Sequence, residues 1–347
     1  MPNLEDYLLP DGRYYFDNAA TTRMSPEALR VYIDTAERWF MNPMSYKDFD
    51  PEIEKLLTNA RSHVAEFVGG DPFNDKVVFT SGATESINLL LKGYFFSNFR
   101  KKRKIITSPI EHKAVLETCK YLESIGAELE YVNITSEGVV DYDHLESIVD
   151  RDTLFVCLMH VNNETGEISD HQRIYDITKA IDTKFFTDTT QSITKLEVNA
   201  EYFDACVGSA HKFHGPKGVG FLYFKTGLNL SPIQHGGKQE SELRAGTHNL
   251  PGILSMITNV NSVVNVKALD EIWKHITTEF FQEYRKIGFN CSPFIGSFIV
   301  NEPGEFERLN KNKIVYSNGS ACNGGLLQNS HIVEALNLQK KFIRISL

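Results

Sequence analysis

The chain has 347 residues, of which 41% are hydrophobic and 23% are charged, the ordinary balance of a soluble globular protein with one large or two smaller domains. Its formal net charge of −9 gives no general attraction for nucleic acid or for an anionic membrane. The run "RKKRK" from Arg100 to Lys104 is the one basic cluster. We interpret it as a solvated loop before a strand rather than as a binding patch.

The cysteines are Cys119, Cys157, Cys206, Cys291 and Cys322. Their number is odd and no two form a C-x-x-C pair, which argues against a disulfide framework and indicates a reducing compartment. No signal-peptide pattern opens the chain, and no apolar stretch approaches the roughly 18 residues that cross a bilayer. We therefore expect a cytoplasmic protein with no membrane partner, no direct nucleic-acid partner and no metal.

Helix-like and strand-like segments alternate through the first two thirds of the chain. The periodicity of apolar residues predicts helices at 25–40, 51–69, 83–96, 112–126, 141–150 and 172–181. Strands are predicted at 76–82, 104–108, 129–134, 153–161, 184–188, 205–210 and 218–224. This order is typical of βαβ units and predicts an α/β fold, with a mainly parallel sheet and helices on both faces.

The pattern changes after about Pro251. Residues 253–288 have the spacing of one or two long helices, and short strands and loops follow. We predict a large domain over residues 15–252 and a smaller domain formed by residues 1–14 and 253–347.

Polar residues gather where the predicted strands end, which is where open α/β sheets bind ligands. In "VVFTSGATES" a strand runs into Ser81, Gly82, Ala83 and Thr84 at the start of a helix. Backbone N–H groups at such a helix start favour a phosphate. A capped helix with no ligand is the alternative interpretation.

Two further strand ends carry candidate cofactor residues. Asp188 follows the apolar strand of "KFFTD", where its carboxylate could hold a protonated ring nitrogen or simply cap the next turn. Lys212 follows a short apolar strand in "GSAHKFHGPKGVG", where it could form a Schiff base or lie on the surface. A phosphate cradle, an aspartate and a lysine in this order together indicate a pyridoxal 5'-phosphate (PLP) site.

Cys322 lies in "SNGSACNGG", which has the composition of a loop rather than of a packed core. An exposed thiol is open to oxidation, so a chemical role is the better explanation for it. Cys157 and Cys206 lie in predicted strands and Cys119 in a predicted helix, so all three are interpreted as packing residues, whereas Cys291, in "GFNCSPF", is ambiguous and is interpreted as structural.

The chain resembles the cysteine desulfurases of the class V aminotransferase family, of the nitrogen-fixation and iron–sulfur-cluster type. The resemblance runs from about Tyr15 to Leu347 and is carried, in family order, by "YFDNAATT", "VVFTSGATESINLLLKG", "SPIEHKAVLETC", "MHVNNETGEI", "TDTTQS", "SAHKFHGPKGVG", "HGGKQESELRAGTHN", "SNGSAC" and "IRISL". It implies the type I fold of PLP-dependent transferases. The loop around Cys322 is similar to the longer, flexible loop of the type I subfamily.

The resemblance also implies site residues. Lys212 would bind the cofactor covalently and move the substrate α-proton, and His112 would stack on the cofactor ring, although it could merely cap a helix. The remaining implied contacts are Asp188 with the ring nitrogen, Gln191 with the ring hydroxyl, Ala83, Thr84, Ser209 and His211 with the phosphate, Thr247 with the phosphate of a partner subunit, and Asn163 and Arg344 with the substrate carboxylate. A homodimer with shared sites follows from the role of Thr247.

The implied activity is the removal of sulfur from L-cysteine. The thiolate of Cys322 would attack the substrate sulfur, leaving a persulfide on Cys322 for an acceptor protein and releasing L-alanine. A selenocysteine lyase, another class V lyase and a non-catalytic scaffold are the alternatives.

Three features depart from the family pattern. The chain stops after "IRISL", the stretch between the long helix and Cys322 is short, and "NPMSYKDFD" lacks a histidine usual there. We expect a reduced small domain around an intact cofactor site. Whether a partner protein completes that domain is left open, as is the acceptor, which could serve iron–sulfur assembly, tRNA thiolation or DNA modification.

Overall fold

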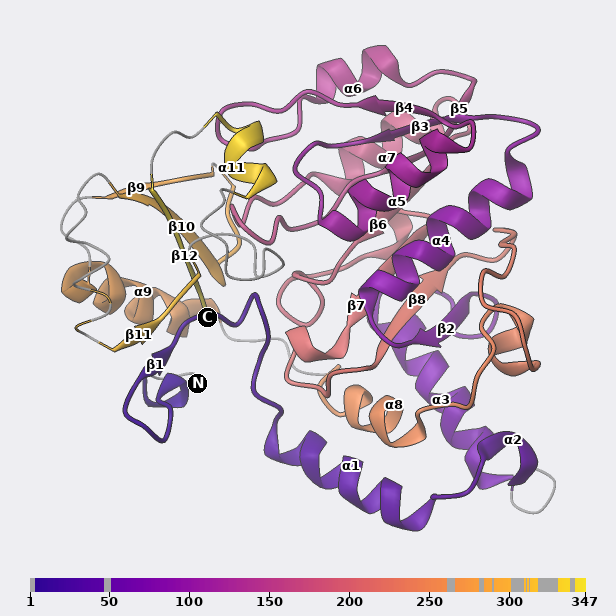
Figure 1. Ribbon diagram of the computed structural model, residues 1–347, viewed down its shortest axis with the longest axis horizontal. Coiled ribbons are helices and arrows are strands. Elements are labelled where there is room, and N and C mark those ends of the chain that lie inside the picture. The colour runs from indigo at the N-terminus through magenta and orange to yellow at the C-terminus, as the bar shows by residue number, and fades with distance from the viewer. Residues whose placement is uncertain are drawn as a thin grey trace.

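The computed structural model describes residues 4–46, 51–260, 266–280, 284–288, 290–300, 309, 311, 313–317, 330–337 and 341–347. Within these ranges the chain builds a large unit around one sheet and a smaller unit beside it (Figure 1). No helix in the described ranges is both long enough and apolar enough to cross a membrane.

The large unit is centred on a seven-stranded sheet. Its spatial order is β2 (Lys76–Thr80), β8 (Gly220–Phe224), β7 (Ala205–Ser209), β6 (Lys184–Asp188), β5 (Thr153–Cys157), β3 (Lys104–Thr107) and β4 (Glu128–Tyr131). Only β8 among these runs against the others, because it pairs antiparallel with both β2 and β7. The predicted α/β fold with a mainly parallel sheet is therefore confirmed.

Helices cover both faces of this sheet, and they follow the predicted helices closely. They are α1 (Pro26–Arg38), α2 (Pro43–Tyr46), α3 (Glu52–Phe67), α4 (Ala83–Asn98), α5 (Lys113–Ser124), α6 (Tyr142–Ile148), α7 (His171–Lys179) and α8 (Leu250–Ile257). Strand β8 shows how one strand serves both faces. Phe221 and Tyr223 pack with α3, α7 and α8, whereas Leu222 and Phe224 pack with α4 on the other side.

The small unit contains α9 (Val266–Phe280), a three-stranded sheet and α11 (His331–Ala335). Its sheet has the order β12 (Lys341–Ser346), β10 (Ile295–Val300), β9 (Tyr284–Lys286), all antiparallel. The N-terminal segment joins it, since β1 (Tyr14–Tyr15) pairs in parallel with β11 (Ile314–Val315). In Figure 1 this unit lies to the left of the central sheet, with both termini beside it.

One predicted element is wrong. One or two long helices were predicted over residues 253–288, but residues 284–286 at the end of that range form strand β9, paired with β10. Pairing with a neighbouring strand overrides the local helical spacing at this point, as tertiary context often does.

Hydrophobic packing bears on where the two units divide. Ile253, Met256 and Val260 pack in the core of the large unit, while Phe16 packs with α9 and β10 in the core of the small one. We propose that the large unit extends to Val260 and that Phe16 belongs with the small unit, a small shift from the predicted boundaries at residues 15 and 252.

Candidate active site

A cavity of about 540 Å³ opens at the edge of the sheet where β2, β3, β5, β6 and β7 all end. Parallel strands place their carboxyl ends at one edge, so segments far apart in the sequence converge there. The predicted residues that line the cavity are Ala83, Thr84, His112, Asn163, Asp188, Gln191, Ser209, His211, Lys212 and Arg344. The structure therefore brings together the residues expected to act on one cofactor, apart from Thr247 and Cys322.

The phosphate cradle is the turn between β2 and α4. Gly82 is the N-cap of α4 and supplies no side-chain cap, so it leaves the first N–H groups of a long helix facing the cavity. Its φ of +151° lies in the region that favours glycine. A Cβ atom at this position would lie 3.3 Å from Ser209 Oγ, so any larger residue would crowd the cradle.

An ion pair between Glu85 and Arg244 stabilises this turn. Glu85, in the first turn of α4, accepts a hydrogen bond from Ser81 N at 2.8 Å and pairs with Arg244 Nε at 2.7 Å. Both side chains are about one-fifth exposed. Burial alone would raise the pKa of Glu85, but the bonds from Arg244 and Ser81 leave it below its usual value.

Lys212 ends a single turn of 3₁₀ helix, η3 (Ala210–Lys212), directly after β7. Its Nζ donates to the carbonyl oxygens of Ala19 and Ala20, each at 2.7 Å. These carbonyls belong to "DNAATT", a motif that the sequence resemblance includes but to which we had assigned no role. The segment holds the amine inside the cavity.

Asp188 and Gln191 follow β6 and are both buried. Asp188 Oδ1 accepts a hydrogen bond from Thr190 N at 2.9 Å, which fits the alternative prediction that Asp188 caps the next turn. This bond uses one carboxylate oxygen, so Oδ2 can accept a bond from another group. Gln191 Nε2 donates to Ala19 O at 2.9 Å, and its Oε1 accepts from Lys195 Nζ at 3.4 Å. Lys195 had not been singled out from the sequence.

His112 both caps α5 and lines the cavity. Its Nδ1 accepts from Ala114 N at 3.1 Å, so in the neutral ring the proton is on Nε2. His211 lies across the cavity, with Nδ1 placed 3.1 Å from Thr21 Oγ1. Burial and the neighbouring charges of Lys212 and Lys217 lower the pKa of His211 to about 4, so this ring is uncharged at neutral pH.

Arg344 comes from β12 of the small unit and is 2% exposed. Its Nη2 pairs with Asp17 Oδ1 at 2.5 Å and its Nη1 donates to Asn163 O at 2.9 Å. Asn163 Oδ1 and Arg344 Nε are buried without a hydrogen-bond partner among the described residues. Unsatisfied polar atoms of this kind beside a cavity indicate that a polar ligand completes the site.

The remaining predicted residues lie elsewhere. Thr247 is exposed and does not line this cavity, so its contact with a partner subunit stays a prediction. Cys322 lies outside the described residues. Cys119, Cys157 and Cys206 are buried, as expected for packing residues, and burial raises the pKa of each thiol. Cys291 is half-buried, and its pKa is raised to about 11, mainly by burial.

Comparison with known proteins agrees with this geometry. The family model of class V aminotransferases matches residues 14–290. Cysteine desulfurase IscS of Dictyoglomus turgidum is 34% identical, with 93% of this chain and 86% of the relative covered. Cysteine desulfurase IscS of Tolumonas auensis is 36% identical, with 96% and 86% covered.

Solved structures show the same likeness. A structure named as a NifS-like protein superposes with a TM-score of 0.87 and 35% identity, covering 96% of this chain and 93% of the other. A structure of SspA in complex with cysteine has a TM-score of 0.87 and 30% identity, covering 96% and 98%. The chain belongs to the class V aminotransferases, a family of PLP-dependent enzymes, and the predicted resemblance to its cysteine desulfurases is confirmed.

Proposed function

We propose that this protein is a cysteine desulfurase that uses PLP, takes sulfur from L-cysteine and carries it as a persulfide on Cys322. The observation that carries the proposal is the convergence of Lys212, Asp188, His112 and the α4 cradle on one cavity. Relatives at 33–36% identity that bear the cysteine desulfurase name support it.

The residues of the cavity fit PLP by charge and by shape. The uncapped start of α4, with Ser209 and His211 beside it, would hold the phosphate. Asp188 would accept a bond from the protonated ring nitrogen, Gln191 would contact the ring hydroxyl and His112 would lie against the ring. When bound, PLP supplies an electron sink for the negative charge that develops at the substrate α-carbon.

Residues of the chain would move the proton, bind the substrate and accept its sulfur. The amine of Lys212, held by Ala19 O and Ala20 O, would move the α-proton, a step typically worth about 10²–10⁴-fold in rate. Arg344 and Asn163 would hold the substrate carboxylate, which would share the guanidinium with Asp17. The Cys322 thiolate would form a bond to the substrate sulfur as the carbon–sulfur bond breaks, and protonation of the carbon would give L-alanine.

The test combines colour, product and one substitution. The purified protein is expected to be yellow and to release alanine and sulfide from L-cysteine under reducing conditions. Cys322→Ser should keep the colour and lose sulfide release, whereas Cys291→Ser, the matched control, should change neither. A colourless protein that forms no alanine would exclude the enzyme, and full sulfide release by Cys322→Ser would exclude Cys322 as the carrier.

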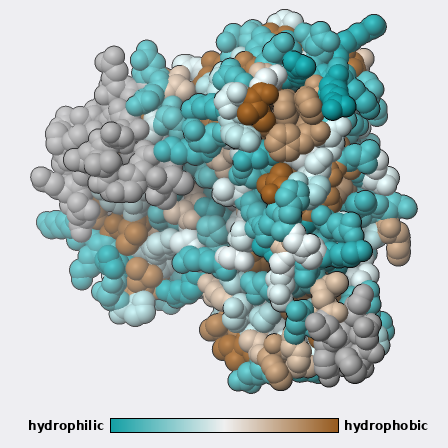
Figure 2. Space-filling model, turned by 45° about the vertical axis from the view of Figure 1, so that its right-hand side comes forward, coloured by the Kyte–Doolittle hydropathy of each residue, from teal (hydrophilic) through white to brown (hydrophobic). Residues whose placement is uncertain are grey.

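We also infer a cytoplasmic homodimer that passes its persulfide to an acceptor or scaffold protein. Leu29 and Ile33, one turn apart on α1, are 48% and 47% exposed, and Phe40 is 81% exposed. Figure 2 shows hydrophobic side chains gathered at the lower end of the molecule, where α1 lies in Figure 1. Exposed apolar residues on one helix face support a subunit contact there. Sedimentation of the wild type against Leu29→Glu tests it, and an unchanged mass would contradict it.

A further inference from the structure

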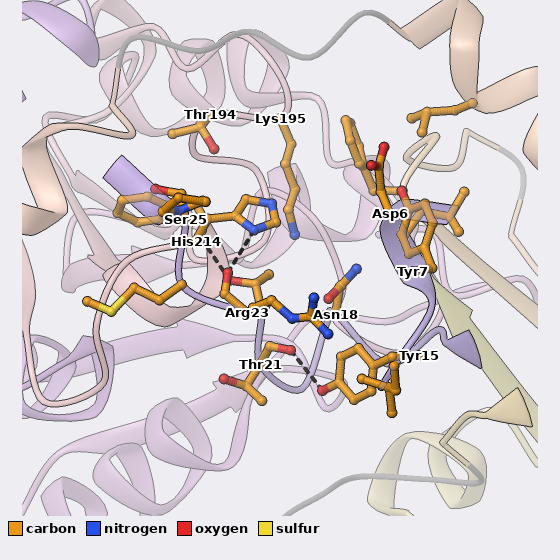
Figure 3. Close-up of a pocket in the computed structure, with 18 residues that line it drawn as sticks. Asp6, Tyr7, Tyr15, Asn18, Thr21, Arg23, Ser25, Thr194, Lys195 and His214 are labelled. Carbon is orange, nitrogen blue, oxygen red and sulfur yellow. Dashed lines mark hydrogen bonds between the residues drawn. The ribbon is translucent and has the colours of Figure 1, made fainter. Parts of the chain in front are cut away.

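A second cavity, of about 560 Å³, lies outside the site described above. It is lined by parts of the chain that are distant in the sequence: residues 6–26, residues 194–195, residues 213–214, and Leu269, Phe294 and Leu347 of the small unit (Figure 3). Much of its wall is apolar and comes from Tyr7, Leu9, Phe213, Leu269 and Phe294. Thr21 lines both cavities, so the two are neighbours without being one space.

Lys195 extends into this cavity although it is only 6% exposed. Its amine makes one long bond, 3.4 Å to Gln191 Oε1, and lies 5.9 Å from the ring centre of Phe294. Within the described part of the chain, no carboxylate pairs with it. Burial, helped by the charges of Lys212 and Arg344, lowers the pKa of Lys195 to about 7. A buried cation without a counter-charge is costly, and an anion beside it would remove that cost.

The backbone beside Lys195 is strained in a way that fits a ligand site. Thr194 has a φ of 64°, which a β-branched residue adopts only under constraint, and its side chain lines the same cavity. Such strain persists where surrounding structure enforces it, often at sites that bind a ligand.

The other charged groups of the cavity limit the charge of its ligand. Arg23 is exposed, and Figure 3 shows its guanidinium reaching into the space that Lys195 enters. Asp6 lines the cavity too and carries the opposite charge. His214 lines the cavity as well, with its Nδ1 3.0 Å from Arg23 O, and burial lowers its pKa, so it adds no charge at neutral pH. Among the charged side chains of the cavity, two cations and one carboxylate match a monoanion better than a dianion.

We propose that this cavity binds a small monocarboxylate with an apolar body, an aliphatic or aromatic acid, whose carboxylate lies between Lys195 and Arg23. The apolar body would pack against the aromatic and leucine side chains of the wall. The site is distinct from that of the amino-acid substrate, whose carboxylate is expected at Arg344. Because Lys195 contacts Gln191, an occupied cavity would be in direct contact with the cofactor site.

Calorimetry on the cofactor-loaded protein tests the proposal, with benzoate and hexanoate as probes and benzamide and hexanamide as their uncharged controls. The acids are expected to bind and the amides to bind at least tenfold more weakly, the usual consequence of losing a charged hydrogen bond. Lys195→Met should weaken binding of the acids by about tenfold or more, and Arg23→Gln by several-fold. Lys179→Met, which changes an exposed lysine on α7, is the matched control and should bind normally.

The location is tested by competition. Excess L-alanine, which carries the substrate's carboxylate, should leave benzoate binding unchanged if the probe is in the second cavity and should displace it if the probe is at Arg344. Displacement by alanine, equal binding of acid and amide, or unchanged binding in Arg23→Gln would overturn the proposal. The Arg23 variant decides the question even if Lys195→Met does not fold, because Arg23 is exposed.

Discussion

The two cavities meet at residues 18–22, yet they are built in different ways. The first takes most of its polar groups from turns that follow strands of the central sheet, where short motifs predicted them, whereas Arg344 comes from β12 of the small unit. The second is assembled from several segments that are distant in the sequence, and no single motif predicted it. The difference shows that polar residues at strand ends can be predicted from short stretches of sequence. A site between the two units depends instead on how distant parts of the chain pack together.

Their electrostatics differ as well. In the first cavity two charged side chains are matched by ion pairs: Arg344 pairs with Asp17, and Glu85 pairs with Arg244. In the second, the ammonium of Lys195 bonds to an amide oxygen and lies near an aromatic ring, and no carboxylate among the described residues pairs with it. The first cavity is therefore organised before its ligand arrives, while the second contains a charge that a ligand would neutralise.

The largest effect is expected at Lys212, the proposed base of the first cavity. Lys212→Ala should lower alanine formation by about 10²–10⁴-fold or more, since proton transfer and the covalent bond to the cofactor are both lost. Steady-state kinetics measure the loss, and absorption spectra report on the bound cofactor. Lys225→Ala, whose amine bonds to Glu201 O on the surface, is the control and should behave as wild type. An active Lys212→Ala enzyme would refute the assignment.

The second-largest effect on activity is expected at Asp188, which is buried at the end of β6. Asp188→Asn keeps the shape but removes the charge, so the protonated form of the ring nitrogen loses its partner. We expect roughly a 10- to 100-fold fall in kcat together with a shift of the cofactor absorption, the scale of one charged hydrogen bond. A variant with wild-type kinetics and spectrum would show that Asp188 serves only as the cap of the turn it already bonds.

In the second cavity, Lys195→Met is expected to stabilise the ligand-free protein. The folded-state pKa of about 7 lies below the unfolded value of about 10.4, so the folded protein loses a proton that the unfolded chain keeps. Wild-type stability should therefore fall as the pH drops from about 10 to about 7, by a few kcal/mol at about 1.4 kcal/mol per pKa unit.

The advantage of Lys195→Met should be greatest at and below about pH 7 and should shrink toward pH 10. The groups that interact with Lys195 are Lys212, Arg344, Gln191 and His214, none of which is negatively charged, and Asp6 is the negatively charged side chain that lines the same cavity. Urea unfolding at several pH values measures the difference. An advantage that does not vary with pH would show that Lys195 is not a buried, uncompensated amine.

The smallest effect is expected at the ion pair between Arg244 and Glu85, next to the phosphate cradle. Arg244→Gln leaves the Glu85 carboxylate unneutralised beside the phosphate position, so cofactor affinity should fall by about tenfold, or roughly 1.4 kcal/mol. Glu85→Gln in the same chain should restore part of that loss, because the repulsive charge is then gone. Fluorescence titration of the cofactor-free protein measures both, and additive losses in the double variant would contradict the coupling.

Some contacts in the first cavity join residues that are far apart in the sequence, and these contacts were not predicted. Ala19 and Ala20 accept hydrogen bonds from Lys212 through their backbone carbonyls, and such contacts cannot be predicted from side-chain types. The pairing of Arg344 with Asp17 joins opposite ends of the chain, and Glu85 meets Arg244 across 159 positions. Long-range contacts of this kind have no local period or motif, so the sequence alone does not reveal them.

By itself the sequence determined the alternation of strands and helices and the strand-end positions of Ser81, Asp188 and Lys212, because apolar periods and turn residues act within a few positions. Tertiary structure decided that residues 284–286 become a strand, that the N-terminal segment pairs with β11, and that Lys195 is buried beside a cavity. Each of these depends on surfaces that meet only after the chain has folded. Burial and pairing are properties of those contacts and not of any residue alone.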